Sequence, residues 1–223
     1  MKVDIWSDVV CPWCYIGKRR FERALAAFVH RDEVEVTWRS FELDQSAEPS
    51  GSTSVGQAER LAAKYGRTLD QAQQMLDQMT EVAASEGLQF RFDLSRTGNT
   101  FDAHRLLHLA LQHGVQDELK ECLDRATFGE GLSVSDHDEL LALAVQVGLD
   151  QEEVREVLAG DRFAGAVRAD EAQAQAHGIS GVPFFVVDGR YGVSGAQPPE
   201  QIVRVLETAW SERGSAPVQP AVS

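Results

Sequence analysis

The sequence predicts an α/β fold whose mixed sheet is split between the two ends of the chain by a large all-helical insertion. Three observations support this prediction. A strand–helix–strand pattern opens the chain, residues 51–177 have helical texture, and a strand–strand–helix pattern follows residue 178. Two strands at each end are too few for a stable sheet, so the ends must join in space and bury a common core against flanking helices.

Residues 1–50 are interpreted as the first half of this unit. Lys2 to Trp6 alternates polar and apolar side chains, which is typical of a strand. From Pro12 to about Val29, apolar residues recur at three- and four-residue steps, which predicts a helix. Glu33 to Phe41 alternates again and predicts a second strand. A strand–helix–strand order favours parallel pairing of the two strands.

Residues 51–177 are interpreted as the helical insertion. A Pro-, Gly-, Ser- and Thr-rich linker precedes it, from Ala47 to Gly56. Thr68 and Gln71 are spaced like a capping box, and Gln89 to Leu94 is a short, extended break. The predicted helices are Val55–Tyr65, Leu69–Ser85, Asn99–His113, Asp117–Phe128, Asp136–Val147, Gln151–Leu158 and Phe163–His177.

Residues 178–213 are interpreted as the second half of the sheet unit. Pro183 to Val187 predicts a strand, and Arg190 to Ser194 predicts a returning strand after an Asp-Gly turn. Pro198-Pro199 is suited to start a last helix. The tail, residues 214–223, has little to bury, and we expect it to be flexible.

Composition excludes two classes of partner. The formal net charge of −14 would be repelled by nucleic acid and by an anionic membrane surface. Lys18-Arg19-Arg20, a local basic cluster, is predicted to form the solvated face of the first helix. No apolar run approaches the roughly 20 residues of a membrane span, and no signal-peptide stretch follows Met1. We expect a cytoplasmic protein that binds neither nucleic acid nor membrane.

The motif Cys11-Pro12-Trp13-Cys14 lies where a strand ends and a helix begins. Cysteines three residues apart in a first helical turn can meet the Cα separation of about 4.4–6.8 Å that a disulfide needs. With Pro12 at the first helical position, Cys11 is the N-cap, and unpaired backbone N–H groups stabilise its thiolate. Cys14, one turn further in, loses that contact. The sequence therefore predicts a redox pair in which Cys11 attacks and Cys14 resolves.

This cysteine pair has two alternative interpretations. Half of a zinc site would need further ligands, but no second Cys-x-x-Cys motif is present, so no metal is expected. Inert cysteines are the other alternative. Cys122 is predicted to be a buried, unreactive thiol.

Val182 and Pro183 form the second candidate motif. A proline opening a buried strand is unusual. A cis bond before it would leave the Val182 N–H and C=O free to pair with an extended substrate. A trans bond at a strand edge is the alternative, because only about 5–6% of X–Pro bonds are cis.

Four further residues are candidates with a plainer structural alternative. Asn99 and His104 are candidates for substrate contact, against simple capping and packing. The N–H groups of Ser194 and the two residues after it could hold a carboxylate such as that of glutathione, or form a simple turn. Asp8 could relay protons to the buried thiol, or only bond to its loop.

The chain resembles the DsbA-like branch of the thioredoxin superfamily, and most closely its FrnE-type cytoplasmic members. Four stretches carry the resemblance: residues 6–17 (WSDVVCPWCYIG), 99–106 (NTFDAHRL), 181–185 (GVPFF) and 193–197 (VSGAQ). It implies a thioredoxin fold, disulfide oxidoreductase activity and a cis Val182–Pro183 bond facing the cysteines. It also implies that the helix from Asn99 covers a substrate groove, and Pro12 and Trp13 would flank that groove.

Two other functions stay open. The related kappa-class glutathione transferases and 2-hydroxychromene-2-carboxylate isomerases typically carry serine at the position of Cys11, so the intact pair favours redox chemistry. A glutathione-dependent isomerase or transferase acting on an aromatic or polyketide-like small molecule is the first alternative. A non-enzymatic binding module or holdase is the second. The expected partners are protein or peptide thiols and disulfides, with glutathione as a candidate co-substrate, no tightly bound cofactor and no prediction of oligomeric state.

Overall fold

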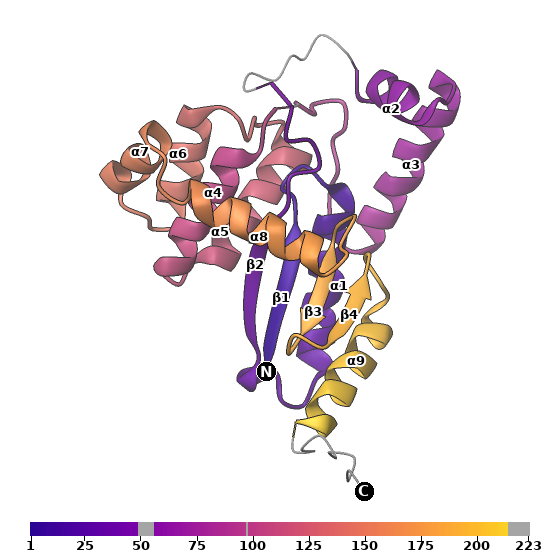
Figure 1. The fold of residues 1–223 in the computed structure, drawn as a ribbon. Coiled ribbons are helices and arrows are strands. Elements are labelled where there is room, and N and C mark those ends of the chain that lie inside the picture. The colour runs from indigo at the N-terminus through magenta and orange to yellow at the C-terminus, as the bar shows by residue number, and fades with distance from the viewer. Residues whose placement is uncertain (49–55, 97, 214–223) are drawn as a thin grey trace, which may run out of the picture.

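The two ends of the chain meet in one four-stranded mixed sheet, as the sequence predicts (Figure 1). The computed structural model describes residues 1–48, 56–96 and 98–213. The strand order is β2-β1-β3-β4. The parallel pair is β1 (Lys2–Ser7) with β2 (Glu35–Ser40). Antiparallel to β1 runs β3 (Phe184–Val187), which pairs in turn with β4 (Tyr191–Ser194).

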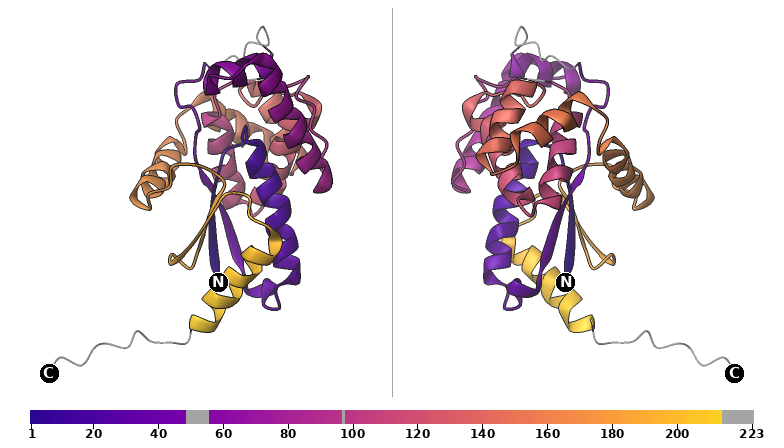
Figure 2. Two further views of the ribbon diagram at one scale, coloured as in Figure 1. Left: turned by 90° about the vertical axis from the view of Figure 1, so that its right-hand side faces the viewer. Right: turned by 90° about the vertical axis from the view of Figure 1, so that its left-hand side faces the viewer.

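Helices cover both faces of this sheet (Figures 1 and 2). One face carries α1 (Pro12–Ala27) and α9 (Pro199–Glu212). The other is crossed by α8 (Ala164–Ala176), which packs against β2. A short 3-10 turn, Arg31–Glu33, leads from α1 into β2.

The remaining helices lie between β2 and β3 in the sequence, as the predicted all-helical insertion requires. They stand beside the sheet and beyond the amino end of α1 (Figure 1). They are α2 (Gln57–Tyr65), α3 (Leu69–Ser85), α4 (Phe101–Gln112), α5 (Gln116–Arg125), α6 (His137–Gln146) and α7 (Gln151–Ala159). The predicted capping box is present at α3, where the Thr68 side chain accepts from the Gln71 N–H at 3.2 Å.

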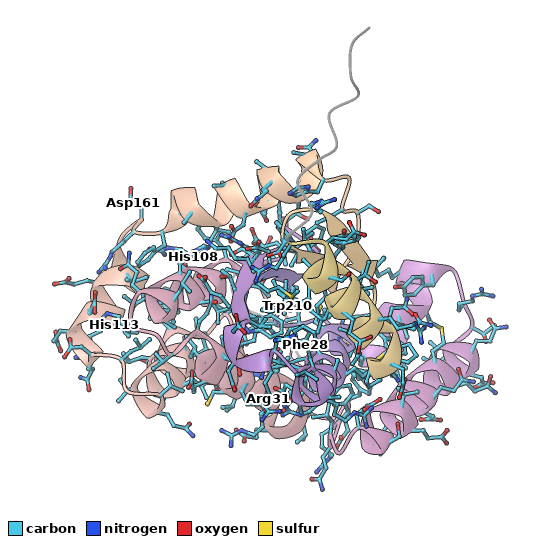
Figure 3. All side chains as sticks on the ribbon, turned by 90° about the horizontal axis from the view of Figure 1, so that it is seen from below. Phe28, Arg31, His108, His113, Asp161 and Trp210 are labelled. Carbon is cyan, nitrogen blue, oxygen red and sulfur yellow. The ribbon has the colours of Figure 1, made fainter. Side chains whose placement is uncertain are left out.

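Two apolar layers sandwich the sheet. Phe21 and Ile202 represent the layer under α1 and α9, while Trp6 and Ile179 represent the layer on the α8 side. The insertion has its own core around α4 to α7. Seen from below in Figure 3, Phe28 and Trp210 close the first layer at the end of the sheet remote from Cys11, with ring centroids 6.0 Å apart.

Two predictions about elements are corrected. The segment Gln89–Leu94 is a break between helices, as predicted, and its Phe90 stacks with Tyr15 and Phe128. The helix predicted to reach Phe128 ends at Arg125 and continues as one π-helical turn, Ala126–Glu130. The helix predicted from Val55 begins at Gln57, and Val55 lies outside the described residues.

The expected flexible tail, residues 214–223, and most of the expected linker, residues 49–55, also lie outside the described residues. Across the part of the chain that is described, no helix combines the length and the apolar character needed to cross a membrane.

The basic cluster at residues 18–20 is not the solvated face that the sequence predicted. The Lys18 side chain is 2% exposed and pairs with Glu22 and Asp117. Arg19 pairs with Glu121 of α5. The prediction failed because α5 places carboxylates over this face of α1. The charges of α1 by themselves do not show that another helix covers them.

Candidate active site

Cys11 lies at the amino end of α1, after the short loop that follows β1. Its backbone is extended, with φ −96° and ψ 108°, and Pro12 occupies the first helical position as predicted. The Cys11 carbonyl accepts the Cys14 N–H at 2.9 Å, which begins the helix. Cys11 is 5% exposed and a free thiol. The sulfur at this N-cap lies at the positive end of the helix dipole, which favours negative charge there.

Cys14 lies directly beneath, with no exposed surface. Burial raises the pKa of the Cys14 thiol well above its ordinary value, and the neighbouring Cys11 raises it further. The Lys120 ammonium and the Asp8 backbone act in the opposite direction on this pKa. Cys14 is therefore a protonated thiol at neutral pH, and its sulfur reacts only when its proton is removed.

The loop before β3 meets the cysteines from the other side. The Val182–Pro183 peptide bond is cis, as the resemblance implied. The Cys11 Sγ–H donates to the Val182 carbonyl oxygen at 3.6 Å. Two segments 171 residues apart in sequence thus meet at one sulfur.

Gly17 lets α1 approach this loop closely. A Cβ at Gly17 would lie 2.8 Å from Cγ of Pro183 and 3.4 Å from its Cβ. Real Cβ contacts are not this short, so a larger residue would push the proline ring away. The glycine in the resembling stretch therefore has a packing reason.

Ser194 lies opposite Phe184 in the sheet and is exposed near Pro183. Of the three N–H groups predicted to hold a carboxylate, that of Gly195 donates to the Pro183 carbonyl at 2.8 Å. Binding of a carboxylate at this turn stays a prediction. Substrate contact by the Ser194 side chain stays a prediction.

The two residues predicted from the NTFDAHRL stretch have different environments. His104 is 1% exposed, and its Nε2 lies 3.2 Å from Oδ1 of Asp8, so the packing alternative describes its surroundings here. Contact of His104 with substrate stays a prediction. Asn99 accepts the Phe101 N–H at 2.8 Å and donates to the Ala47 carbonyl at 3.3 Å. The N-cap of α4 is Thr100, one residue after Asn99, so Asn99 is not the predicted cap; its side chain joins the start of α4 to the loop after β2.

Trp13 and Pro12 frame the site on its outer side. Trp13 is 41% exposed, a large apolar surface next to Cys11, and Pro12 is half-buried. Apolar surface of this kind beside a reactive group is what a substrate would cover. Cys122 is partly buried on α5, and burial raises its pKa.

Lys120 and Asp124 form a buried ion pair near Cys14 that the sequence does not predict. Lys120 and Asp124 are fully buried on α5, and the Lys120 Nζ donates to Asp124 Oδ1 at 2.5 Å. The Lys120 Nζ also lies 5.2 Å from the centre of the Trp38 ring. The four-residue spacing of Lys120 and Asp124 allows an ion pair on either an exposed or a buried face of a helix. The packing of α5 against the sheet shows that this pair is buried. Among the described residues, no three His, Cys, Asp or Glu side chains gather as a metal site.

Known proteins resemble this chain in sequence and in fold. A family model described as a DSBA-like thioredoxin domain matches residues 2–207. The crystal structure of a probable DsbA oxidoreductase from Streptomyces coelicolor is 49% identical, with a TM-score of 0.91, and the match covers 100% of this chain and 95% of that one. The uncharacterized protein YwbO of Bacillus subtilis strain 168 is 28% identical over 189 residues, 83% of this chain and 86% of YwbO.

A more distant likeness shows the fold alone. The cytosolic disulfide reductase DsbM from Pseudomonas aeruginosa is 16% identical, with a TM-score of 0.65, and the match covers 95% of this chain and 99% of that one.

Proposed function

Because this chain belongs to the family of DsbA-like thioredoxin domains, we propose that it is a thiol–disulfide oxidoreductase in which Cys11 attacks and Cys14 resolves. The observation that carries the proposal is the position of the Cys11 sulfur. It lies at the amino end of α1 and 3.6 Å from the Val182 carbonyl oxygen. The positive end of the helix dipole favours negative charge on a sulfur placed there, and the Val182 backbone beside it offers a place for an extended substrate.

The exchange runs in two displacements. The Cys11 thiolate attacks one sulfur of a substrate disulfide, the substrate S–S bond breaks, and the other substrate sulfur leaves as a thiolate. Cys14 then loses its proton to solvent and attacks the Cys11 sulfur, so that the second substrate sulfur leaves. The substrate is reduced by two electrons and the Cys11–Cys14 pair is oxidised. The reverse sequence oxidises a substrate dithiol.

The substrates we propose are protein or peptide thiols and disulfides. An extended segment around the substrate cysteine would pair with the backbone of Val182, and its apolar side chains would cover Trp13. Three observations support this surface: the half-buried Val182, the exposed Trp13 and the cis bond at Pro183, all close to Cys11.

We further propose that the enzyme works in the cytoplasm with glutathione as co-substrate. A cytosolic glutathione pool at about −220 to −260 mV would keep a more oxidising Cys11–Cys14 pair reduced, and the net reaction would then be reduction. Equilibration of the purified protein with glutathione buffers, followed by alkylation and mass measurement, gives the midpoint potential of the Cys11–Cys14 pair. A midpoint potential more negative than that of the glutathione pool would exclude net reduction of substrates.

Turnover of insulin disulfides tests the proposal. Cys11→Ser is expected to reduce turnover to the uncatalysed rate, because no other described thiol lies at the helix N-terminus. Cys14→Ser is expected to trap a mixed disulfide on Cys11. Cys122→Ser is the matched control, and its turnover should equal that of the wild type. Full activity in Cys11→Ser would refute the proposal, and a glutathione-dependent isomerase activity that survives Cys11→Ser would favour the alternative function.

A further inference from the structure

The outer edge of β2 is only partly covered. β2 is an end strand of the sheet, with β1 on one side (Figure 1). At Trp38 the side chain of Gln116 takes the place of a neighbouring strand. The Trp38 N–H donates to Gln116 Oε1, and Gln116 Nε2 donates to the Trp38 carbonyl, both at 2.9 Å. The Ser40 N–H donates to Oδ2 of Asp170 at 2.9 Å. These contacts protect the second half of the edge from pairing with another chain.

Val36 has its backbone on the same edge. Alternate residues of a strand direct their N–H and C=O groups to the same side. The Glu35 N–H faces β1, since it donates to the Met1 carbonyl at 2.7 Å. The groups of Val36 therefore face outward, as those of Trp38 do. In the part of the chain that the structure describes, no residue outside the sheet bonds to them. The N–H and C=O of Val36 are thus free to pair with a further strand.

A hollow of about 400 Å³ lies beside this edge. Its volume is within the range of ligand sites in proteins, roughly 300–1,000 Å³. Its apolar lining comes from α1, β2 and α4 and includes the half-buried Leu25, Val34 and Val36 and the exposed Leu111. An added strand could therefore bury an apolar side chain here while its backbone pairs with β2.

The charged residues that line the hollow are all acidic. They are Glu22, Asp117 and Glu118, and no described Lys, Arg or His lines it. Glu22 and Asp117 each pair with the buried Lys18, and Glu22 also pairs with Arg19. Glu118 has no ion-pair partner among the described residues. This rim attracts positive charge, and it would repel the same acidic edge of a second copy of the chain.

We propose that this edge is a docking site for an extended, basic segment of a partner protein, which adds to β2 beside Val36. Side chains two positions apart on such a segment share one face. An apolar residue enters the hollow, and a lysine or arginine two positions away reaches the carboxylate of Asp117 or Glu118. Backbone pairing supplies affinity, and the apolar and basic positions supply selectivity.

The docking site is separate from the cysteines. Phe21 and Leu25 line the hollow from α1. At 1.5 Å per residue, these positions lie about 15 to 21 Å along the helix axis from Cys11. A segment docked on β2 therefore leaves Cys11 accessible, and the site does not depend on the proposed redox chemistry.

A synthetic peptide tests the site. The acetylated peptide amide Thr-Lys-Thr-Val-Thr-Lys-Thr, when extended, places its lysines and its valine on one face. It is titrated into isotope-labelled protein, and the backbone amides are followed by NMR. The Val36 amide is expected to shift and to exchange more slowly with solvent, while the amides of Cys11 and Val182 keep their positions.

Two N-methylated forms of the peptide test for strand pairing. Each carries methyl groups on one of the two alternating sets of backbone nitrogens. Only one set faces β2 in an added strand. Methylation of that set is expected to weaken binding tenfold or more, because the N–H groups that pair with β2 are lost. Methylation of the other set should leave binding unchanged.

Glu118→Lys tests the acidic rim. It is expected to weaken binding of the peptide about fivefold, because an exposed ion pair is lost. Glu35→Lys is the matched control. It changes the net charge equally, but the exposed Glu35 side chain lies on the other face of β2. Its binding constant should equal that of the wild type.

Four outcomes would overturn the inference. Equal weakening in Glu118→Lys and Glu35→Lys would assign the binding to the charge of the whole molecule. Equal effects of the two N-methylated peptides would exclude strand pairing. Shifts at Cys11 and Val182 in place of Val36 would assign the peptide to the active site. A free protein that already pairs through β2 as a dimer would assign the edge to a second copy.

Discussion

At the scale of single residues, the site divides its chemistry between one cysteine at a helix end and one inside the helix. Cys11 has the N-terminal position that favours a thiolate, while Cys14 has no exposed surface. The two sulfurs are three residues apart in sequence, but their surroundings give them different reactivity. Two consequences can be measured without a substrate.

The first concerns stability at alkaline pH. Because burial raises the pKa of Cys14 in the folded protein, the folded state keeps a proton that the unfolded chain releases above about pH 8.5. We expect the free energy of unfolding of the reduced protein to fall as pH rises through that value, by up to about 1.4 kcal/mol per pH unit. Urea unfolding of the wild type and of Cys14→Ala, both under reducing conditions, measures the difference. Parallel pH curves for the two proteins would contradict this expectation.

The second concerns the buried pair beside Cys14. Burial raises the pKa of Asp124 to about 6 even with Lys120 beside it. Lys120→Met leaves that carboxylate buried alone, with an expected loss of about 3–5 kcal/mol near pH 8. The loss should shrink toward pH 5, where the carboxyl group takes up a proton. The double variant Lys120→Met with Asp124→Leu should recover most of the stability in denaturant titrations. A double variant as unstable as the single one would exclude the charge as the cause.

The sequence predicts the reactive residues of this site better than the buried residues that pack around them. Cys11, Cys14 and Pro183 each belong to a short motif whose residue types indicate a chemical role. His104 and Asp8 are 96 residues apart, and nothing local to either predicts their contact. The burial of Lys120 was equally hidden, because it depends on where α5 lies over the sheet.

At the scale of elements, the fit between α1 and the loop before β3 depends on Gly17. Gly17→Ala places a methyl group against the Pro183 ring, and displacement by about 1 Å of a group that positions substrate can lower activity on the order of 100-fold. We expect insulin turnover to fall 10- to 100-fold while the fold persists.

Gly165→Ala is the control for helix propensity. It lies within α8, where an added Cβ meets nothing within 4 Å. Replacing glycine by alanine there should stabilise the protein by about 0.5–1 kcal/mol and leave turnover unchanged. If Gly17→Ala also kept full turnover, close packing at Pro183 would not matter for activity.

The elements themselves were predicted well wherever one period dominated. β1, α1, β2 and the hairpin of β3 and β4 follow directly from alternation, apolar spacing and an Asp-Gly turn. The segment Gln89–Leu94 was predicted only as a break, because its few aromatic residues do not say what they pack against. Its Phe90 stacks on Phe128, with centroids 4.9 Å apart.

At the scale of the whole molecule, the net charge of −14 acts on every encounter. Cationic disulfide peptides should react faster than anionic peptides of the same length at low ionic strength. The two rates should converge near 1 M salt, where the screening length is about 3 Å. Stopped-flow measurement of the first displacement with matched Lys- and Glu-containing peptides tests this. Rates that do not change with salt would show that the field at Cys11 differs from that of the protein as a whole.

The order of the strands has a consequence for the newly made chain. Cys11 leaves the ribosome long before Val182, 171 residues later, whose carbonyl it contacts in the finished protein. At about 5–20 residues per second, that delay is roughly 9 to 34 s. During this delay the central strand β1 lacks its neighbour β3. The two thiols therefore do not yet have the surroundings that they have in the folded protein. The Cys11 thiol therefore gains its contact with the Val182 carbonyl only after most of the chain has been synthesised.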